Sequence, residues 1–314
     1  MSTAGRRPLL ALAQRLAPYA IALLAIGWVL RSTDRVALLK ALEHAPILPF
    51  VLVSAVMLVC NCAADTFAMR SVFGWFDCHV PYWDLFFVRA STYLLAVVNY
   101  HVGQAAIVGY LYKVRKVPFL RATGWILFII GINVGTLFLL ASAGAARAPS
   151  DLKLLRMVPL ACGIGVVTYA GLLTLKPAPL ARIGLFAPLF EMGIPGHIKG
   201  VLVRLPHVAV LLTWHFVSLR MFKVAVPWQA ALLYLPAYFA VSSLPINVNG
   251  LGVAQLVAVA FFARFAEVPA GVTDVAGAQR AAVLAYSFAT SGVSILLQVV
   301  LGFASLRRAA RVAT

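Results

Sequence analysis

Polar residues interrupt two long apolar stretches of the chain, and their types and spacing suit the handling of a polar ligand inside a membrane. The first interruption, within residues 83–112, contains Asn99, His101, Gly103 and Gln104. The second, within residues 228–265, contains Asn247, Asn249, Gly250, Gly252 and Gln255. Backbone N–H and C=O groups that leave helical geometry in hydrocarbon must be satisfied by protein or by cavity water. Both interruptions therefore predict segments that line a substrate path, and surface turns are the alternative.

A third set of polar residues recurs at helical spacing near the end of the chain. These residues are Ser287, Thr290, Ser291, Ser294 and Gln298. Such a stripe predicts a helix face turned to the interior of a bundle, where it lines the path or packs against another helix. Arg89 lies inside the first long stretch, where it either extends to the headgroups or binds the phosphate of an anionic lipid.

Ionisable residues are expected to be scarce at membrane depth. We place Asp65 at the end of a span and Glu191 in a connection at the cytoplasmic surface, so no acidic residue is expected within a span. His101 and His215 are expected to be hydrogen-bonded packing residues. The sequence contains no metal-ligand spacing, phosphate-binding loop or nucleophile motif. These features favour a protein that is not an enzyme and that needs neither a metal nor a cofactor.

The composition indicates which solvent the elements face. The chain has 314 residues, of which 63% are hydrophobic and 11% are charged, whereas soluble domains carry about 25% charged residues. The net charge is +17, but Lys and Arg lie mainly in short connections between apolar runs. That pattern is typical of membrane topology. We expect an integral membrane protein with lipids as partners and no nucleic acid.

The apolar runs predict the elements that position the polar residues. Six runs each match one membrane crossing: Leu16–Leu30, Pro46–Ala64, Phe119–Gly144, Leu154–Leu175, Pro206–Phe222 and Ala281–Leu306. The two interrupted stretches are too long for one crossing of about 20 residues. The predicted fold is an all-α polytopic helical bundle of about six spans plus two broken or re-entrant helical hairpins, in a single transmembrane domain over residues 1–314.

Charge counting supports the hairpins. If both hairpins return to the side they entered from and the N-terminus is cytoplasmic, 15 Lys and Arg lie inside and 10 outside; single crossings would give 12 and 13. The positive-inside tendency favours the first count, with both termini cytoplasmic in the cell (inner) membrane. Three crossings then separate residues 1–147 from 148–314, which predicts an inverted repeat, an architecture typical of transporters. Val-Pro pairs at 80–81 and 226–227 open the two hairpins.

Two motifs carry a resemblance to a known family. The segment Leu244-Pro245 through Asn249-Gly250-Leu251-Gly252-Val253-Ala254-Gln255 resembles the Pro…Gly-Gly-Leu-Gly-Val-x-Glu signature of the flippase-like membrane domain of lysylphosphatidylglycerol synthases. Gly103-Gln104 and Tyr110-Leu111-Tyr112, with the basic residues that follow, are similar to that family's earlier motif. The acidic residue of each motif is replaced here by Gln104 or Gln255. The chain therefore resembles a divergent, stand-alone member without the synthase domain.

The resemblance implies a flippase-like transporter of a polar lipid or a lipid-linked envelope precursor. The headgroup would pass between the two hairpins while the acyl chains stay in the bilayer. The alternative is a non-catalytic membrane subunit that docks an envelope-lipid biosynthetic enzyme through the basic connections at 113–121 and 176–204. The sequence makes no prediction of the oligomeric state.

Overall fold

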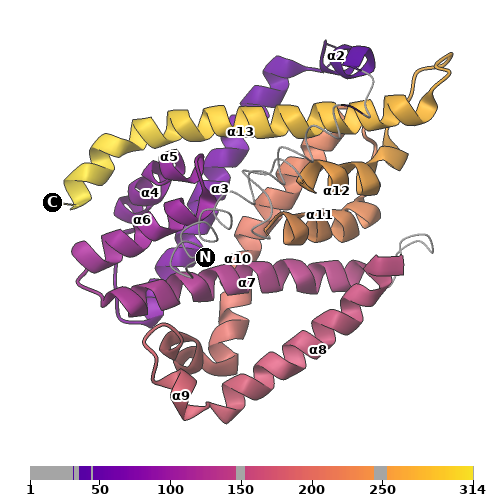
Figure 1. Ribbon diagram of the computed structural model, residues 1–314. Coiled ribbons are helices and arrows are strands. Elements are labelled where there is room, and N and C mark those ends of the chain that lie inside the picture. The colour runs from indigo at the N-terminus through magenta and orange to yellow at the C-terminus, as the bar shows by residue number, and fades with distance from the viewer. Residues whose placement is uncertain (1–30, 32–34, 44, 146–152, 244–252, 314) are drawn as a thin grey trace, which may run out of the picture.

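The computed structural model describes residue 31 and residues 35–43, 45–145, 153–243 and 253–313 (Figure 1). Every named element in these residues is a helix. The helices are α2 (Arg35–Glu43), α3 (Ile47–Trp75), α4 (Tyr82–Ser91), α5 (Tyr93–Ala96), α6 (Tyr100–Lys113), α7 (Phe119–Ala145), α8 (Lys153–Leu175), α9 (Ala178–Ala181), α10 (Ala187–Met221), α11 (Trp228–Ser242), α12 (Val253–Phe262), the 3-10 helix η1 (Ala263–Phe265) and α13 (Val275–Ala313).

Five helices, α3, α7, α8, α10 and α13, are long and apolar enough to cross a membrane. They correspond to five of the six predicted spans, and Leu16–Leu30 lies outside the described residues. Their outer faces carry large apolar side chains such as Leu48, Val167 and Phe303, which are 70%, 73% and 63% exposed. Lipid is a suitable solvent for such surfaces, whereas water is not. The predicted all-α polytopic membrane fold is confirmed.

Three of the spanning helices are clearly longer than the sequence predicted, and one of them, α13, covers Val275–Ala313 where the prediction was Ala281–Leu306. Helix α3 continues past Asp65 to Trp75, and α10 begins at Ala187 instead of at Pro206. Gly193, with φ 54°, bends α10 near its start, and Pro206 is accommodated inside the helix. Pro is tolerated in membrane helices because neighbouring groups satisfy the freed carbonyl. The predicted connection at 176–205 is thus largely helical, and Asp65 lies inside a helix.

The first interrupted stretch is a helical hairpin in which α5 and α6 pack closely. Asn99 has extended backbone (φ −159°, ψ 126°), and its side-chain oxygen accepts a hydrogen bond from the His101 N–H at 2.8 Å. This N-cap starts α6 directly after the break. Gly103 then faces α5 so tightly that a Cβ there would lie 2.9 Å from the Cβ of Ala96. The second stretch forms α11 and α12, and the residues between them, 244–252, lie outside the described part of the chain.

The turns that lead into the two hairpins share one backbone conformation. Asp77 and Lys223, 146 positions apart, have φ values of 59° and 57°. After each of them, the next N–H donates to a carbonyl in the preceding helix, at 3.0 and 2.9 Å. Pro81 and Pro227 follow, with φ values of −56° and −61°, and start α4 and α11. The two Val-Pro pairs therefore follow turns that have the same local backbone conformation.

Helices α3 and α10, which precede these turns, run in opposite directions (Figure 1). Three contacts join them in reverse order along the chain: Ser54 with Trp214, Asn61 with His207, and Asp65 with Arg204. Helix α13, which follows the second hairpin, packs along α4 of the first, and α7 packs along α11 of the second. Each hairpin thus packs against the spanning helix that follows the other hairpin, which is the arrangement expected of an inverted repeat. The boundaries 1–147 and 148–314 stay a prediction.

Candidate functional site

A charged centre is buried between α3, α4 and α10. Nε of Arg89 donates to Oδ2 of Asp65 at 2.6 Å, and Nη1 of Arg204 donates to Oδ1 of the same carboxylate. Asp65, Arg89 and Arg204 are 3%, 5% and 4% exposed. Because guanidinium groups stay protonated in proteins, these three residues carry one net positive charge within the bundle.

Neutral groups take up the remaining hydrogen bonds of the two guanidinium groups. Nε of Arg204 donates to Oδ1 of Asn133 on α7 at 2.9 Å, and Nη1 of Arg89 donates to Oγ1 of Thr92 at 3.1 Å. The Arg89 guanidinium also lies 5.0 Å from the centre of the Tyr93 ring. A buried charge is tolerated only when it is paired and hydrogen-bonded. The charged centre therefore ties α3, α4, α7 and α10 together and joins the two predicted halves.

The charged centre corrects three sequence predictions. Asp65 is an acidic residue within a spanning helix, because the apolar run continues after it to Trp75. Arg204 is buried inside α10 and does not lie in a cytoplasmic connection. Arg89 is held by Asp65, so its side chain does not extend to the headgroups.

A cavity of about 140 Å³ lies between α10, α11 and α13. One water molecule occupies about 30 Å³ in the liquid, so the cavity has room for several waters or for a small polar group. In the described part of the chain, no Lys, Arg, Asp or Glu lines it. The residues that line it are His215, Tyr238, Phe239, Ser242, Tyr286, Ser287, Thr290, Ser291, Ser294, Ile295 and Gln298. It is a neutral, hydroxyl-rich cavity between membrane-spanning helices.

The cavity brings together two sets of residues predicted from the sequence. All five residues of the α13 stripe line it. Nε2 of Gln255, which is fully buried on α12, donates to Oγ of Ser287 at 3.2 Å. The Tyr238 hydroxyl is adjacent to the hydroxyls of Ser242 and Ser287. The motif glutamine of the second hairpin and the polar stripe therefore belong to one site.

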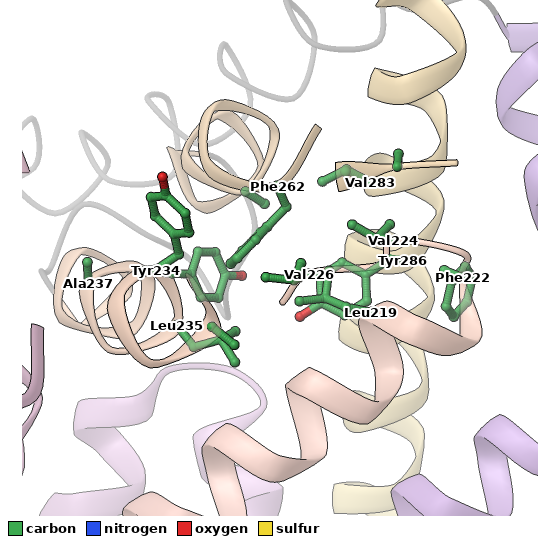
Figure 2. Close-up of a cluster of buried hydrophobic side chains, with 14 of the residues drawn as sticks. Leu219, Phe222, Val224, Val226, Tyr234, Leu235, Ala237, Phe262, Val283 and Tyr286 are labelled. Carbon is green, nitrogen blue, oxygen red and sulfur yellow. The ribbon is translucent and has the colours of Figure 1, made fainter. Parts of the chain in front are cut away.

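Two hydroxyls beside this cavity have no hydrogen-bond partner within the described residues. They are the hydroxyls of Tyr286 and Thr290, which are 1% and 6% exposed. Tyr286 belongs to an apolar cluster with Leu219 and Phe222, and its hydroxyl is directed away from α13 (Figure 2). A buried hydroxyl without a partner costs about 1–3 kcal/mol. Both groups thus have hydrogen-bonding capacity left for water or a ligand.

The other predicted site residues lie elsewhere. Gln104 is 7% exposed and is adjacent to the Tyr100 hydroxyl, which is within electrostatic reach of Arg89. The structure therefore places Gln104 on the side of the charged centre, apart from Gln255. His101 is exposed. Asn99 and Gly103 lie at the start of α6, and Asn247, Asn249, Gly250 and Gly252 lie outside the described residues.

Sequence reasoning missed several cavity residues. It treated His215 as a packing residue, and it did not single out Tyr238, Ser242 or Tyr286. His215 does make a local contact, with Nδ1 3.0 Å from the carbonyl oxygen of Leu211, but its ring also lines the cavity. Tyr286 directly precedes Ser287 of the stripe, and this adjacency in the sequence could have indicated that Tyr286 lies near the same site.

The chain was compared with family models, with curated proteins and with solved structures, and none of these comparisons found a match. The resemblance to the flippase-like domain therefore stays a prediction. Among the described residues, no group of three or more His, Cys, Asp or Glu side chains is placed to hold a metal ion. The function is argued from the cavity and its surroundings.

Proposed function

We propose that this multi-pass membrane protein is a flippase-like transporter of a polar lipid or a lipid-linked envelope precursor. The observation that carries the proposal is the neutral, hydroxyl-rich cavity of about 140 Å³ between α10, α11 and α13. A polar headgroup that crosses a bilayer must exchange its water for protein hydrogen bonds, because an unpaired polar group in hydrocarbon costs several kcal/mol. The cavity offers such partners, while the acyl chains remain in the lipid.

The chemistry of the cavity favours an uncharged, hydroxylated part of a headgroup. Serine, threonine and tyrosine hydroxyls both donate and accept hydrogen bonds, and the Gln298 amide does the same through its nitrogen and oxygen. Tyr286 and Thr290 of the lining supply two hydroxyls that have no partner among the described residues. Since no charged side chain of the described chain lines the cavity, transport would not require a coupled ion there.

The surroundings of the cavity also support transport. Ser287 connects it through Gln255 to α12, at the second hairpin. At its other end, Gln298 is one helical turn from Gly302, where a Cβ would lie 2.7 Å from Cγ of Leu94 in the first hairpin. A polar path near both broken segments is typical of transporters with inverted repeats. We propose the cell (inner) membrane as the location, with both termini cytoplasmic, because the sequence places more Lys and Arg on that side of the predicted topology.

Transport can be measured with purified protein in phosphatidylcholine vesicles that contain a trace of a fluorescent, tail-labelled lipid. Dithionite bleaches only the outer leaflet of empty vesicles, and a flippase makes the inner leaflet accessible as well. Ser287→Ala and Gln255→Ala should slow this second phase because each removes one hydrogen bond of the cavity network. Ser142→Ala is the matched control, since that exposed hydroxyl only bonds the Phe138 carbonyl of its own helix at 2.7 Å.

Lipids with sugar, glycerol and choline headgroups should be compared in the same assay. If vesicles with folded wild-type protein bleach no further than empty vesicles for every headgroup, the transporter proposal is wrong. The alternative, a membrane subunit that docks a biosynthetic enzyme through 113–121 and 176–204, would then be favoured.

A further inference from the structure

A second, open hollow lies at the base of the first hairpin. Its volume is about 540 Å³, and its lining comes from the turn between α3 and α4, the turn between α6 and α7, and the start of α7. Because α3 and α7 are spanning helices, this end of the bundle lies at the membrane surface. The residues that line the hollow are Phe76, Asp77, Cys78, His79, Val114, Arg115, Lys116, Val117, Pro118, Arg121 and Trp125.

The charge of this hollow is positive. Arg115, Lys116 and Arg121 line it together with a single carboxylate, that of Asp77, which leaves a surplus of two positive charges in the lining. Nη2 of Arg121 is paired with Oε2 of Glu191 at 2.7 Å, and with this carboxylate counted the surplus is one positive charge. Nη2 of Arg115 donates to the carbonyl of His79, a neutral partner, so its charge is not cancelled there. Arg115 and Lys116 therefore supply most of the field.

The lining of the hollow also includes a residue with a hydrogen-bond donor that lacks an acceptor. The indole N–H of Trp125 has no partner within the described residues, although this residue is only 2% exposed. Its ring is stacked on Phe76, with 4.9 Å between ring centroids and 10° between planes. An indole N–H can only donate a hydrogen bond. A ligand that completes this site must bring an acceptor.

The start of α7 adds to the same chemistry. This 27-residue helix begins at Phe119, directly after Pro118 of the lining. The first turn of a helix has free N–H groups and a partial positive charge, which together favour anions. The ligand that suits this hollow is therefore an anion with hydrogen-bond acceptors. The cationic side chains, the donor-only indole and the helix N-terminus all favour such a ligand.

We propose that this hollow binds a phosphate group. Phosphate oxygens accept several hydrogen bonds and carry the negative charge that Arg115 and Lys116 match. The hollow is much larger than one phosphate group, so a phosphate attached to a larger molecule fits. The source is either a lipid headgroup at the membrane surface or a soluble phosphorylated compound. This proposal does not rest on transport through the cavity.

The full-length purified protein can be tested with two probes: phosphatidic acid in phosphatidylcholine nanodiscs, and inorganic phosphate added to detergent-solubilised protein. Binding should change the intrinsic fluorescence, and Trp125→Phe, which keeps an aromatic ring on Phe76, should abolish that change. Lys116→Gly and Arg115→Ala should each weaken binding about tenfold, as expected for one charge-assisted hydrogen bond. Lys116→Gly suits the φ of 57° at this position, so the variant keeps the fold. Lys113→Ala, an exposed cation outside the lining, is the matched control.

The two probes distinguish the possible sources of the phosphate. Binding of phosphatidic acid alone supports a lipid source, and binding of inorganic phosphate that competes with the lipid supports a site open to soluble phosphates. If folded wild-type protein binds neither probe, or if Lys113→Ala weakens binding as much as Lys116→Gly, the proposal is wrong.

Discussion

Each hairpin follows a spanning helix and a turn of the same backbone conformation, but the polar side chains near the two hairpins differ in how many of their hydrogen bonds are satisfied. Beside the first hairpin, the Arg89 guanidinium is bound by Asp65 and Thr92. Beside the second, Tyr286 and Thr290 of α13 have no hydrogen-bond partner among the described residues. Groups that satisfy one another hold helices together, whereas groups with spare capacity can bind a ligand.

This difference distinguishes polar groups that hold helices together from polar groups that have hydrogen-bonding capacity for a ligand. The charged centre makes contacts among four helices and is nearly inaccessible. The cavity near the second hairpin contains weaker, neutral donors and acceptors beside open volume. We infer that the charged centre holds the two predicted halves together, and under the proposed function the cavity is where a headgroup would be exchanged. Four predictions test this comparison.

The largest effect is expected from Asp65→Ala. This change leaves the guanidinium groups of Arg89 and Arg204 buried without their shared carboxylate. Breaking a buried pair by removing one partner costs about 3–5 kcal/mol. The variant should lose most of its folded, monodisperse fraction when size-exclusion chromatography follows a thermal ramp in detergent.

Glu191→Ala is the control for this prediction. The Glu191–Arg121 pair has side chains 39% and 41% exposed, and surface pairs contribute about 0–1 kcal/mol. Equal thermal stability of Asp65→Ala and Glu191→Ala would contradict a structural role for the charged centre.

Tight packing within the first hairpin predicts the next effect. In Gly103→Ala the new methyl would lie 2.9 Å from Cβ of Ala96 and 3.1 Å from the Thr92 carbonyl oxygen. Overpacking of this kind costs about 1–3 kcal/mol. Gly109→Ala on the same helix meets no atom within 4 Å and should raise helix stability by up to about 1 kcal/mol. A lower melting temperature for Gly109→Ala than for Gly103→Ala would refute the close contact.

Thr290→Val should affect stability and transport in opposite directions. The hydroxyl it removes is buried and lacks a partner within the described residues, so the free energy of unfolding should stay constant or rise by about 1 kcal/mol. Lipid transport should nevertheless slow, because the cavity loses a free donor. Thr136→Val, which removes a buried hydrogen bond of 2.7 Å to the Ile132 carbonyl, should instead lower stability by about 1 kcal/mol. Unchanged transport by folded Thr290→Val would remove this hydroxyl from the path.

The changes with the smallest expected effect test whether the two predicted halves have opposite orientations in the membrane. Asp77 and Lys223 occupy the matching turns and are both exposed. In a background that lacks the four native cysteines, Asp77→Cys should react with an impermeant reagent only from the cytoplasmic side, and Lys223→Cys only from the outside. Neither change should alter folding. Labelling of both positions from one side would disprove the inverted arrangement.

The sequence by itself determined the class of protein and most of its elements. Long apolar runs predicted five of the spans that the structure describes, because a helix that faces lipid must be apolar over its whole length. The polar interruption that contains Asn99 and Gly103 predicted the first break, and the structure shows that Asn99 caps the helix after it. The polar stripe from Ser287 to Gln298 was readable because helical spacing alone puts those residues on one face.

Only the tertiary structure decided which polar residues are engaged. Arg204 and Asp65 are 139 positions apart, so no local pattern shows that they meet, and each residue taken alone resembled the end of a span. A charge can lie inside the bilayer only when a different helix supplies its partner. Likewise, the stripe became a cavity wall only because α10 and α11 leave space opposite it. Side-chain periodicity depends on the backbone of one helix, whereas pairing and open volume depend on how several helices pack.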